Sequence, residues 1–240
     1  MSLYNRDYVH NQSVERQEEH VYEEPQIRTE TDLVAFVKTT YQLFAASCIA
    51  ATAGAYIGVG MAAAIQSWFW GLVILEIAML FGLMFTRTKP GINLLMLFGF
   101  TFVTGLTLAP LLSSILSMPG GGGIVGQAFF LTAVITGGLS LFAINTTRDF
   151  SGMGKGLFIA LIIVIIASIV NIFLGSPLLQ VAIAGIGAIL FSAFILYDTQ
   201  RIIRGEFATP VEAAVAIYLD VLNLFISLLQ ILGILGSNDE

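Results

Sequence analysis

Long apolar runs alternate with short polar breaks along most of this chain. Seven of the runs are close to the roughly 20 residues that a helix needs to cross the hydrocarbon core of a bilayer. We expect spanning helices at Leu33–Ile57, Ser67–Phe85, Ile92–Leu112, Ile124–Ile144, Gly156–Leu174, Pro177–Arg201 and Val211–Leu235. Turn-forming residues separate them, among them Lys89-Pro90-Gly91 and Gly175-Ser176-Pro177. Because the connections are short, helices that follow one another in the chain should run antiparallel.

Composition supports this interpretation. Hydrophobic residues make up 57% of the 240 residues and charged residues only 11%, with a mean hydropathy of +0.88. Soluble domains carry about 25% charged residues, so the chain is expected to be an all-α polytopic membrane protein. Its single cysteine, Cys48, lies inside an apolar run, which excludes an intrachain disulfide and a cysteine-based metal site.

The acidic residues are concentrated before the first apolar run. Half of the chain's 16 acidic residues lie within residues 1–32. Residues 1–30 are polar and contain no apolar run, which is the composition of a disordered segment. We therefore divide the chain into an acidic cytoplasmic tail (residues 1–30), a seven-helix transmembrane domain (31–236) and an external C-terminal end (237–240).

The basic residues predict the orientation. All ten lysines and arginines lie in the tail, at the start of the first run, or in the connections after the second, fourth and sixth runs. The other three connections and the C-terminal residues contain none. Lysine and arginine are enriched on the cytoplasmic side of membrane proteins. The pattern thus predicts a multi-pass protein of the inner (plasma) membrane, with a cytoplasmic N-terminus and an external C-terminus.

Three carboxylates interrupt the apolar runs. Asp198 lies about 5–9 Å from the cytoplasmic helix end, Asp220 about 14 Å and Glu76 about 16 Å, at 1.5 Å per residue. A charged residue at the centre of a membrane helix costs about 2.5–3.5 kcal/mol on insertion scales. Arg87 and Arg201 lie at the same end of the helices. We expect these groups to form one polar site.

Two carboxyl groups close together in a low dielectric cannot both ionise cheaply, so Asp198 and Asp220 are expected to share a proton. Loss of that proton would replace a hydrogen bond with repulsion and would push the last two helices apart. The carboxylate oxygens would also suit calcium or another hard cation. Structural alternatives stand beside this hypothesis: Asp198 pairs only with Arg201 or Gln200, and Glu76 binds backbone groups.

Several membrane chemistries are excluded. Both histidines, His10 and His20, lie in the tail, which leaves no intramembrane catalytic triad or zinc site. No lysine lies deep in a helix, so a retinal Schiff base is excluded. The glycines Gly120–Gly123 lack the lysine of a phosphate-binding loop and are interpreted as a flexible external turn. We expect no enzymatic activity, no cofactor, no bound metal and no nucleic-acid partner.

The chain also resembles the Bax inhibitor-1 family of membrane proteins, in the manner of its bacterial members. The resemblance covers roughly residues 30–236. Its most specific parts are TGLTLAPLL (Thr104–Leu112), LYDTQRI (Leu196–Ile202) and IYLDVLNLFISLLQILG (Ile217–Gly233). Glu76 and Arg87 also match the family pattern.

The resemblance implies a central last helix wrapped by two three-helix layers and a pH-sensitive calcium leak across the membrane. Asp198 and Asp220 would be its di-aspartyl pH sensor, Arg87 would latch onto Asp198 when the pore shuts, and Glu76 would line the path. Many family members carry an arginine where this chain has Gln230. A role of that cation is therefore not expected here.

Two other functions remain in competition with a calcium leak. The bacterial members of the family include one that binds and restrains a membrane-bound AAA protease through its cytoplasmic N-terminal tail, and this chain also has a long tail. The alternative is therefore an integral-membrane modulator of such a protease. The third hypothesis, a proton-coupled transporter of a small solute, is disfavoured because the helices contain few charged side chains that could bind a substrate.

Overall fold

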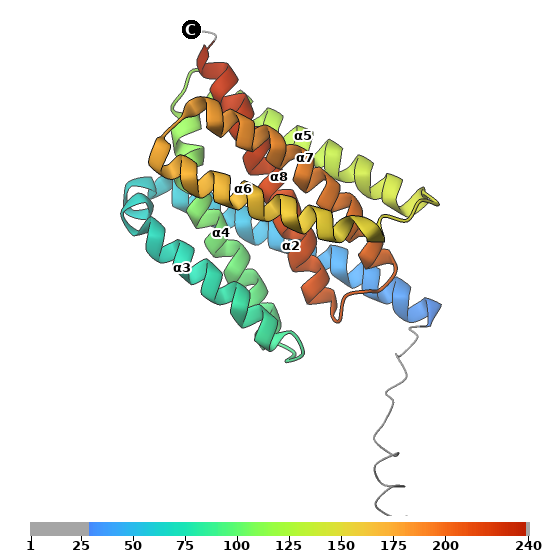
Figure 1. The fold of residues 1–240 in the computed structure, drawn as a ribbon. Coiled ribbons are helices and arrows are strands. Elements are labelled where there is room, and N and C mark those ends of the chain that lie inside the picture. Colours follow the sequence, from blue (N-terminus) through green and yellow to red (C-terminus); the bar gives the residue numbers. More distant parts are fainter. Residues whose placement is uncertain (1–28, 239–240) are drawn as a thin grey trace, which may run out of the picture.

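The computed structural model describes residues 29–238 as a bundle of helices without strands (Figure 1). Seven helical spans are long and apolar enough to cross a membrane, which confirms the prediction. The helices are α2 (Glu30–Gly60), α3 (Ala62–Thr86), α4 (Ile92–Leu116), α5 (Gly121–Asn145), α6 (Gly154–Leu174), α7 (Pro177–Ile203) and α8 (Pro210–Asn238). A short 3₁₀ helix, η1 (Ser151–Met153), precedes α6.

The ends of the helices follow local capping chemistry. Helix α2 begins with a capping box, in which the Thr29 side chain accepts from the backbone N–H of Asp32 and the Asp32 carboxylate accepts from that of Thr29. Two later helices also begin with a capping residue. Ser176 caps the start of α7, with Pro177 in the first turn, and the Thr209 hydroxyl accepts from the N–H of Glu212 at the start of α8. The predicted tail falls almost wholly on residues 1–28, which lie outside the described residues.

One predicted turn was wrong. Gly121–Gly123 form the first turn of α5 rather than a flexible turn, and only Gly120 adopts a left-handed conformation, with φ of 69°. A Cβ on Gly121 would lie 1.9 Å from the Ile115 carbonyl oxygen, so the glycine permits a tight packing of α5 against α4. Helix α8 continues through Asn238, past the predicted end of the last apolar run at Leu235.

Helix α8 occupies the centre of the bundle, as expected. It packs against α2, α4, α5 and α7, while α3 packs on α4 and α6 packs on α7. The other six helices thus form two groups of three, α2–α4 and α5–α7, with α8 between them (Figure 1). This arrangement leaves no α8 residue from Val211 to Ile234 exposed, and Ile217, Leu224 and Leu229 are fully buried.

Helices α2 and α4 approach each other closely because glycines lie at their contact. A Cβ on Gly105 of α4 would lie 2.0 Å from the Ala51 carbonyl oxygen, and one on Gly54 of α2 would lie 2.1 Å from the Phe102 carbonyl oxygen. Small residues allow such close packing between membrane helices, where the hydrophobic effect contributes little. Gly58, four residues after Gly54, lies at the same contact, against Ala109 of α4.

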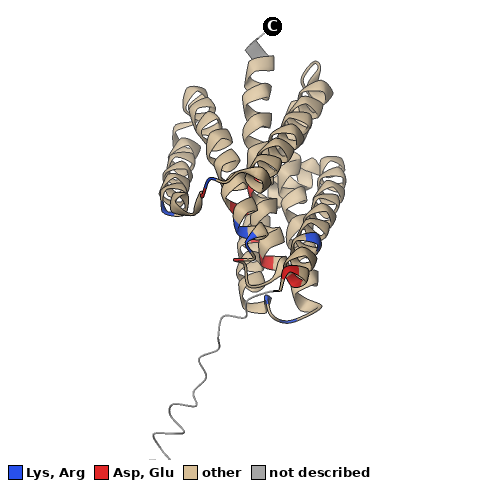
Figure 2. Ribbon diagram, turned by 90° about the vertical axis from the view of Figure 1, so that its right-hand side faces the viewer, with Lys and Arg blue, Asp and Glu red and all other residues tan. Residues whose placement is uncertain are grey.

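The ionisable residues gather toward one end of the bundle, opposite the C-terminus of α8 (Figure 2). This end contains the start of α2, the α3–α4 turn, the segment between α5 and α6, and the loop between α7 and α8. We call it the charged end. Its composition agrees with the predicted one-sided distribution of lysine and arginine.

Candidate functional site

Asp198 and Asp220 lie in the apolar contact between α7 and α8. On each helix the aspartate takes a position in a buried stripe with the same four-, three- and four-residue spacing. The α7 stripe is Phe191, Ile195, Asp198 and Ile202, and the α8 stripe is Ala213, Ile217, Asp220 and Leu224. Such a spacing keeps side chains on one face of a helix. Both aspartates therefore stand where an apolar residue would complete the contact.

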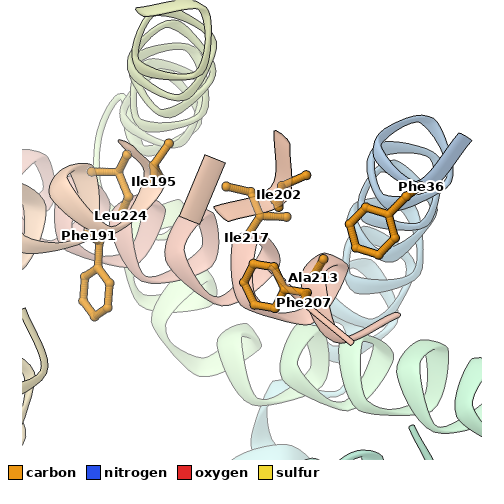
Figure 3. Close-up of a cluster of buried hydrophobic side chains, with 8 residues drawn as sticks. All are labelled: Phe36, Phe191, Ile195, Ile202, Phe207, Ala213, Ile217 and Leu224. Atoms are coloured by element: carbon orange, nitrogen blue, oxygen red, sulfur yellow. The ribbon is translucent and has the colours of Figure 1, made fainter. Parts of the chain in front are cut away.

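Apolar side chains surround the pair on both sides along the helix axes. Figure 3 shows the cluster, which combines the α7 and α8 residues with Phe36 of α2 and Phe207 of the α7–α8 loop. Toward the charged end, Ile202 and Ile217 are fully buried, and on the opposite side Ile195 and Leu224 are fully buried. The two carboxyl groups are thus enclosed between two apolar layers.

The structure brings the Asp198 and Asp220 carboxyl groups within hydrogen-bonding reach of each other. Each residue is only 6% exposed. The Oδ2 atom of Asp220 is buried and has no donor among the described residues. Ionised carboxylates are acceptors only, so two of them in contact need a proton between them. The geometry is therefore that of a pair able to share one proton.

Arg201 binds the Asp198 side of the pair. Its Nη1 atom lies 3.0 Å from Asp198 Oδ1. The guanidinium also lies 4.0 Å from the centroid of the Phe207 ring and 5.4 Å from that of Tyr197. These ring contacts fix the guanidinium in place. The pairing of Asp198 with Arg201, considered as a structural alternative, thus coexists with the contact to Asp220.

Gln200 does not contribute to the aspartate pair. Its side chain donates to the Arg148 carbonyl at 2.7 Å and accepts from the Phe150 N–H at 2.9 Å. These two bonds hold the segment between α5 and η1 against α7. The sequence alternative that paired Gln200 with Asp198 is therefore wrong, since the Gln200 amide is engaged elsewhere.

A chain of charged groups connects the pair to the surface of the charged end. Arg201 Nε lies 3.6 Å from Glu206, Arg204 Nη1 lies 3.9 Å from Glu206, and Arg204 Nη1 lies 2.7 Å from Asp149 Oδ1. The Ser151 backbone N–H, followed by the Arg204 guanidinium, lowers the pKa of the exposed Asp149 carboxyl below its ordinary value. This chain joins the α7–α8 loop to the segment before α6.

Glu76 lies apart from the aspartates. Its carboxylate accepts a hydrogen bond from the Thr107 hydroxyl of α4. It faces a cavity of about 550 Å³ between α3, α4 and α8, whose lining includes Asn223 but neither aspartate. The expectation of one polar site containing all three carboxylates is therefore wrong. Helix α3 packs on α4 and not on α7, so Glu76 cannot reach the α7–α8 contact.

Arg87 also lies away from the pair in this structure. Its Nη1 atom is 3.9 Å from Glu212 Oε2 at the start of α8, and Asp198 is bound by Arg201 instead. The latch between Arg87 and Asp198 is thus not formed here. Sequence reasoning missed Glu212, although its position in the first turn of the last helix, where acidic residues are favoured, was a usable signal.

No group of three or more histidine, cysteine, aspartate or glutamate residues that could hold a metal ion occurs within residues 29–238. The aspartate pair supplies carboxylate oxygens from two residues only. A permanently bound calcium ion needs about six to eight oxygen ligands. The chemistry available at the pair is therefore proton exchange, with cation contact only when water or further oxygens join it.

Comparison with known proteins identifies the family. Residues 33–237 match the family model described as "Inhibitor of apoptosis-promoting Bax1". The chain belongs to this Bax inhibitor family. Among relatives, an uncharacterized protein of Campylobacter jejuni is 50% identical over 241 residues, covering 99% of this chain and 100% of that protein. An uncharacterized protein of Helicobacter pylori is 48% identical over 239 residues, covering 100% of both.

A more distant Bax inhibitor family relative comes from a virus. The Golgi anti-apoptotic protein of vaccinia virus is 36% identical over 162 residues, which cover 66% of this chain and 65% of that protein. The Helicobacter pylori match spans the whole chain and so includes the acidic segment before α2. The family thus accounts for the seven spans, and the bacterial relatives extend the similarity to residues 1–28.

Proposed function

We propose that this Bax inhibitor family protein is a pH-sensitive leak channel for cations, with calcium as the permeant ion and the Asp198–Asp220 pair as its gate. The observation that supports the proposal most is the contact of two buried carboxyl groups inside an otherwise apolar interface between α7 and α8. An interface of this kind gains nothing in packing from two acids. A contact that forms only when the pair holds a proton would explain why two acidic residues occupy this interface.

The closed state holds one proton between the two carboxyl groups. Because Arg201 lies 3.0 Å from Asp198, the negative charge is favoured on Asp198 and the proton on Asp220. The proton makes a hydrogen bond between the helices, and the layers of Ile195 with Leu224 and of Ile202 with Ile217 close the contact on both sides. Water and ions are excluded from the dry interface.

Loss of the proton opens the contact. Two negative charges in a low dielectric repel strongly, and α7 and α8 then separate or one aspartate turns toward another cation. Separation admits water to the α7–α8 interface and presents carboxylate oxygens, which are the ligands that calcium prefers. The pair is thus a two-state element controlled by protonation.

Arg87 contributes to the proposal as a latch at the charged end. In this structure it pairs with Glu212 at 3.9 Å, with both side chains partly exposed. Exposed pairs of this kind are worth about 0–1 kcal/mol, so the pairing exchanges readily. A movement at the start of α8 would release Arg87 from Glu212 and free it to bind another carboxylate.

Calcium flux in proteoliposomes tests the channel. The full-length protein should release calcium at a rate that depends on pH, and Asp198→Asn and Asp220→Asn should each abolish that dependence. Asp149→Asn is the matched control, because it also removes an arginine-paired acid at the charged end but lies outside the pair. A pH profile that stays unchanged in both pair variants would reject the gate.

We propose as a second function the modulation of a membrane-bound AAA protease through the N-terminal tail, a segment that the full-length match to the Helicobacter pylori protein includes. It requires no ion flux. Deletion of residues 2–28 should then change the turnover of a membrane substrate in cells while calcium flux in proteoliposomes stays the same. Unchanged turnover would remove this second function and leave the channel hypothesis untouched.

A further inference from the structure

The cavity that Glu76 faces is separate from the aspartate pair and has the size of a ligand site. Its volume of about 550 Å³ falls within the range of small-molecule pockets, about 300–1,000 Å³. Helices α3, α4 and α8 form its walls, and α3 packs on α4 without an extensive contact to α8. The cavity therefore lies between two spans that are not packed together, where a molecule dissolved in the bilayer can enter.

The lining is apolar apart from a few oxygen- and nitrogen-bearing side chains. Aliphatic residues from all three helices contribute most of it, and Phe69 and Phe100 contribute aromatic rings. Glu76 is the only ionisable side chain that lines it among the described residues. The lining thus combines a hydrophobic surface with a single acidic group, which selects for an amphipathic ligand.

The Glu76 carboxylate has no cationic partner within residues 29–238. Its hydrogen bond in this structure comes from the Thr107 hydroxyl. The same hydroxyl can donate to the Thr104 carbonyl oxygen instead. Glu76 lies ten residues before the end of α3 at Thr86, about 15 Å along the helix. A carboxylate at this depth is costly unless it is paired or protonated. An external cation would supply the missing partner.

The surroundings of Glu76 favour an organic cation over a metal ion. Calcium takes about six to eight oxygen ligands, and magnesium demands an octahedral set. Here a single carboxylate, with the hydroxyls of Thr104 and Thr107 and the amides of Gln66, Asn223 and Gln230, is set among hydrocarbon. One carboxylate leaves a divalent ion with an uncompensated positive charge in an apolar surrounding. The charge of a hydrophobic organic cation would pair with the carboxylate and would be attracted to the rings of Phe69 and Phe100 by cation–π interaction. Its hydrocarbon groups would pack against the aliphatic walls.

We propose that the cavity between α3, α4 and α8 binds hydrophobic organic monocations, with Glu76 as the counter-ion. The site does not depend on the aspartate pair, which lies in a different helix contact. Occupancy would place a ligand against a different face of α8 from the one that carries Asp220, because the lining residues Leu219, Leu222 and Ile226 lie about 100–160° around the helix from it.

Binding of tetraphenylphosphonium to the purified full-length protein in phosphatidylcholine nanodiscs tests the proposal. Binding above that to empty nanodiscs should be saturable. Glu76→Gln should weaken it about tenfold or more, because the glutamine keeps the shape of the side chain but removes the charge that pairs with the cation. Asp149→Asn, which removes an acid at the charged end far from the cavity, should bind as the wild type does.

A probe of the same shape but opposite charge separates charge recognition from simple partitioning. Tetraphenylborate should not compete for the site. Val73→Phe, which fills the cavity one helical turn from Glu76 and keeps the carboxylate, should reduce binding even if Glu76→Gln fails to fold. Equal binding in Glu76→Gln, equal competition by tetraphenylborate, or no saturable binding at all would overturn the proposal and leave a groove filled by lipid.

Discussion

The two aspartates of the pair should respond differently to the same substitution. Arg201 binds Asp198 at 3.0 Å, whereas the Asp220 carboxyl contacts Asp198 and has an oxygen without a donor among the described residues. An asparagine at position 220 can donate its N–H to the Asp198 carboxylate and so replaces the shared proton. An asparagine at position 198 loses the negative charge that Arg201 binds. We therefore expect Asp198→Asn to be the more destabilising change.

The magnitude follows from the type of hydrogen bond lost. A hydrogen bond to a charged group contributes about 1.5–3 kcal/mol and a neutral one about 0.5–1.5 kcal/mol. In Asp198→Asn the Asp220 carboxyl group would donate to a neutral amide oxygen instead of a carboxylate, so this change should cost about 1–1.5 kcal/mol in the free energy of unfolding. Asp220→Asn should cost less than about 0.5 kcal/mol, because its contact is retained. The double variant should resemble Asp198→Asn alone.

Reversible unfolding in mixed detergent micelles, measured over a pH series, provides the assay. At alkaline pH the wild type should lose stability as the two charges repel, while Asp220→Asn should not. The order of stability should then reverse, with Asp220→Asn above the wild type. Equal costs for the two single variants, or a larger cost for Asp220→Asn, would refute the assignment of the charge to Asp198 and the proton to Asp220.

Two further predictions concern the scaffold. Gly105→Ala places a Cβ 2.0 Å from a backbone oxygen of α2 and should destabilise the bundle by about 1–3 kcal/mol. Gly137→Ala is the control: its Cβ would meet no neighbouring atom within 4 Å, so it should be neutral or stabilising in the same unfolding assay. The pKa of the Asp149 carboxyl group is lowered in the folded protein. Its contribution to stability is therefore fully present above its ordinary pKa and is lost as the pH falls through the lowered pKa. Hydrogen exchange of the Ser151 backbone amide, corrected for intrinsic rates, should therefore accelerate at strongly acidic pH in the wild type. In Asp149→Asn it should be fast at all pH values. Equal protection of this amide in the two proteins would contradict the prediction.

The spanning helices were predictable because the bilayer fixes their length and composition. Every predicted apolar run became a helix, and the differences lie at the ends. Helix α2 starts at Glu30, three residues before the predicted start, because the capping box of Thr29 and Asp32 extends it into polar sequence. Helix α5 starts at Gly121, since backbone packing against Ile115 outweighs the poor helix propensity of glycine.

The contact between Asp198 and Asp220 was predictable from residue type, although the estimated depths did not agree. Asp198 lies five residues before the end of α7 at Ile203, and Asp220 lies ten residues after the start of α8 at Pro210. These spacings correspond to about 8 Å and 15 Å. The side chains nevertheless meet, so α8 extends further toward the charged end than α7 does. A hydropathy pattern does not contain this offset.

The grouping of Glu76 and Arg87 with the aspartates failed for a related reason. Sequence gives the level of a residue along a helix but not the helix that its side chain faces. Glu76 turns to Thr107 of α4, and Arg87 turns to Glu212 of α8. Only the packing of α3 on α4, which depends on the complete set of helix contacts, decides these directions.

In the proposed closed state, Asp198 and Asp220 hold one proton between them. Infrared difference spectroscopy of the reconstituted protein during a pH titration measures it directly, through the carbonyl stretch of a protonated carboxyl group. We expect a band that disappears on alkalinisation, that is lost in Asp220→Asn and that persists in Glu76→Gln. In Asp198→Asn the band should remain but be altered, because the buried Asp220 carboxyl group keeps its proton and loses its carboxylate partner. A band unchanged by both aspartate substitutions, or lost only in Glu76→Gln, would contradict the shared proton.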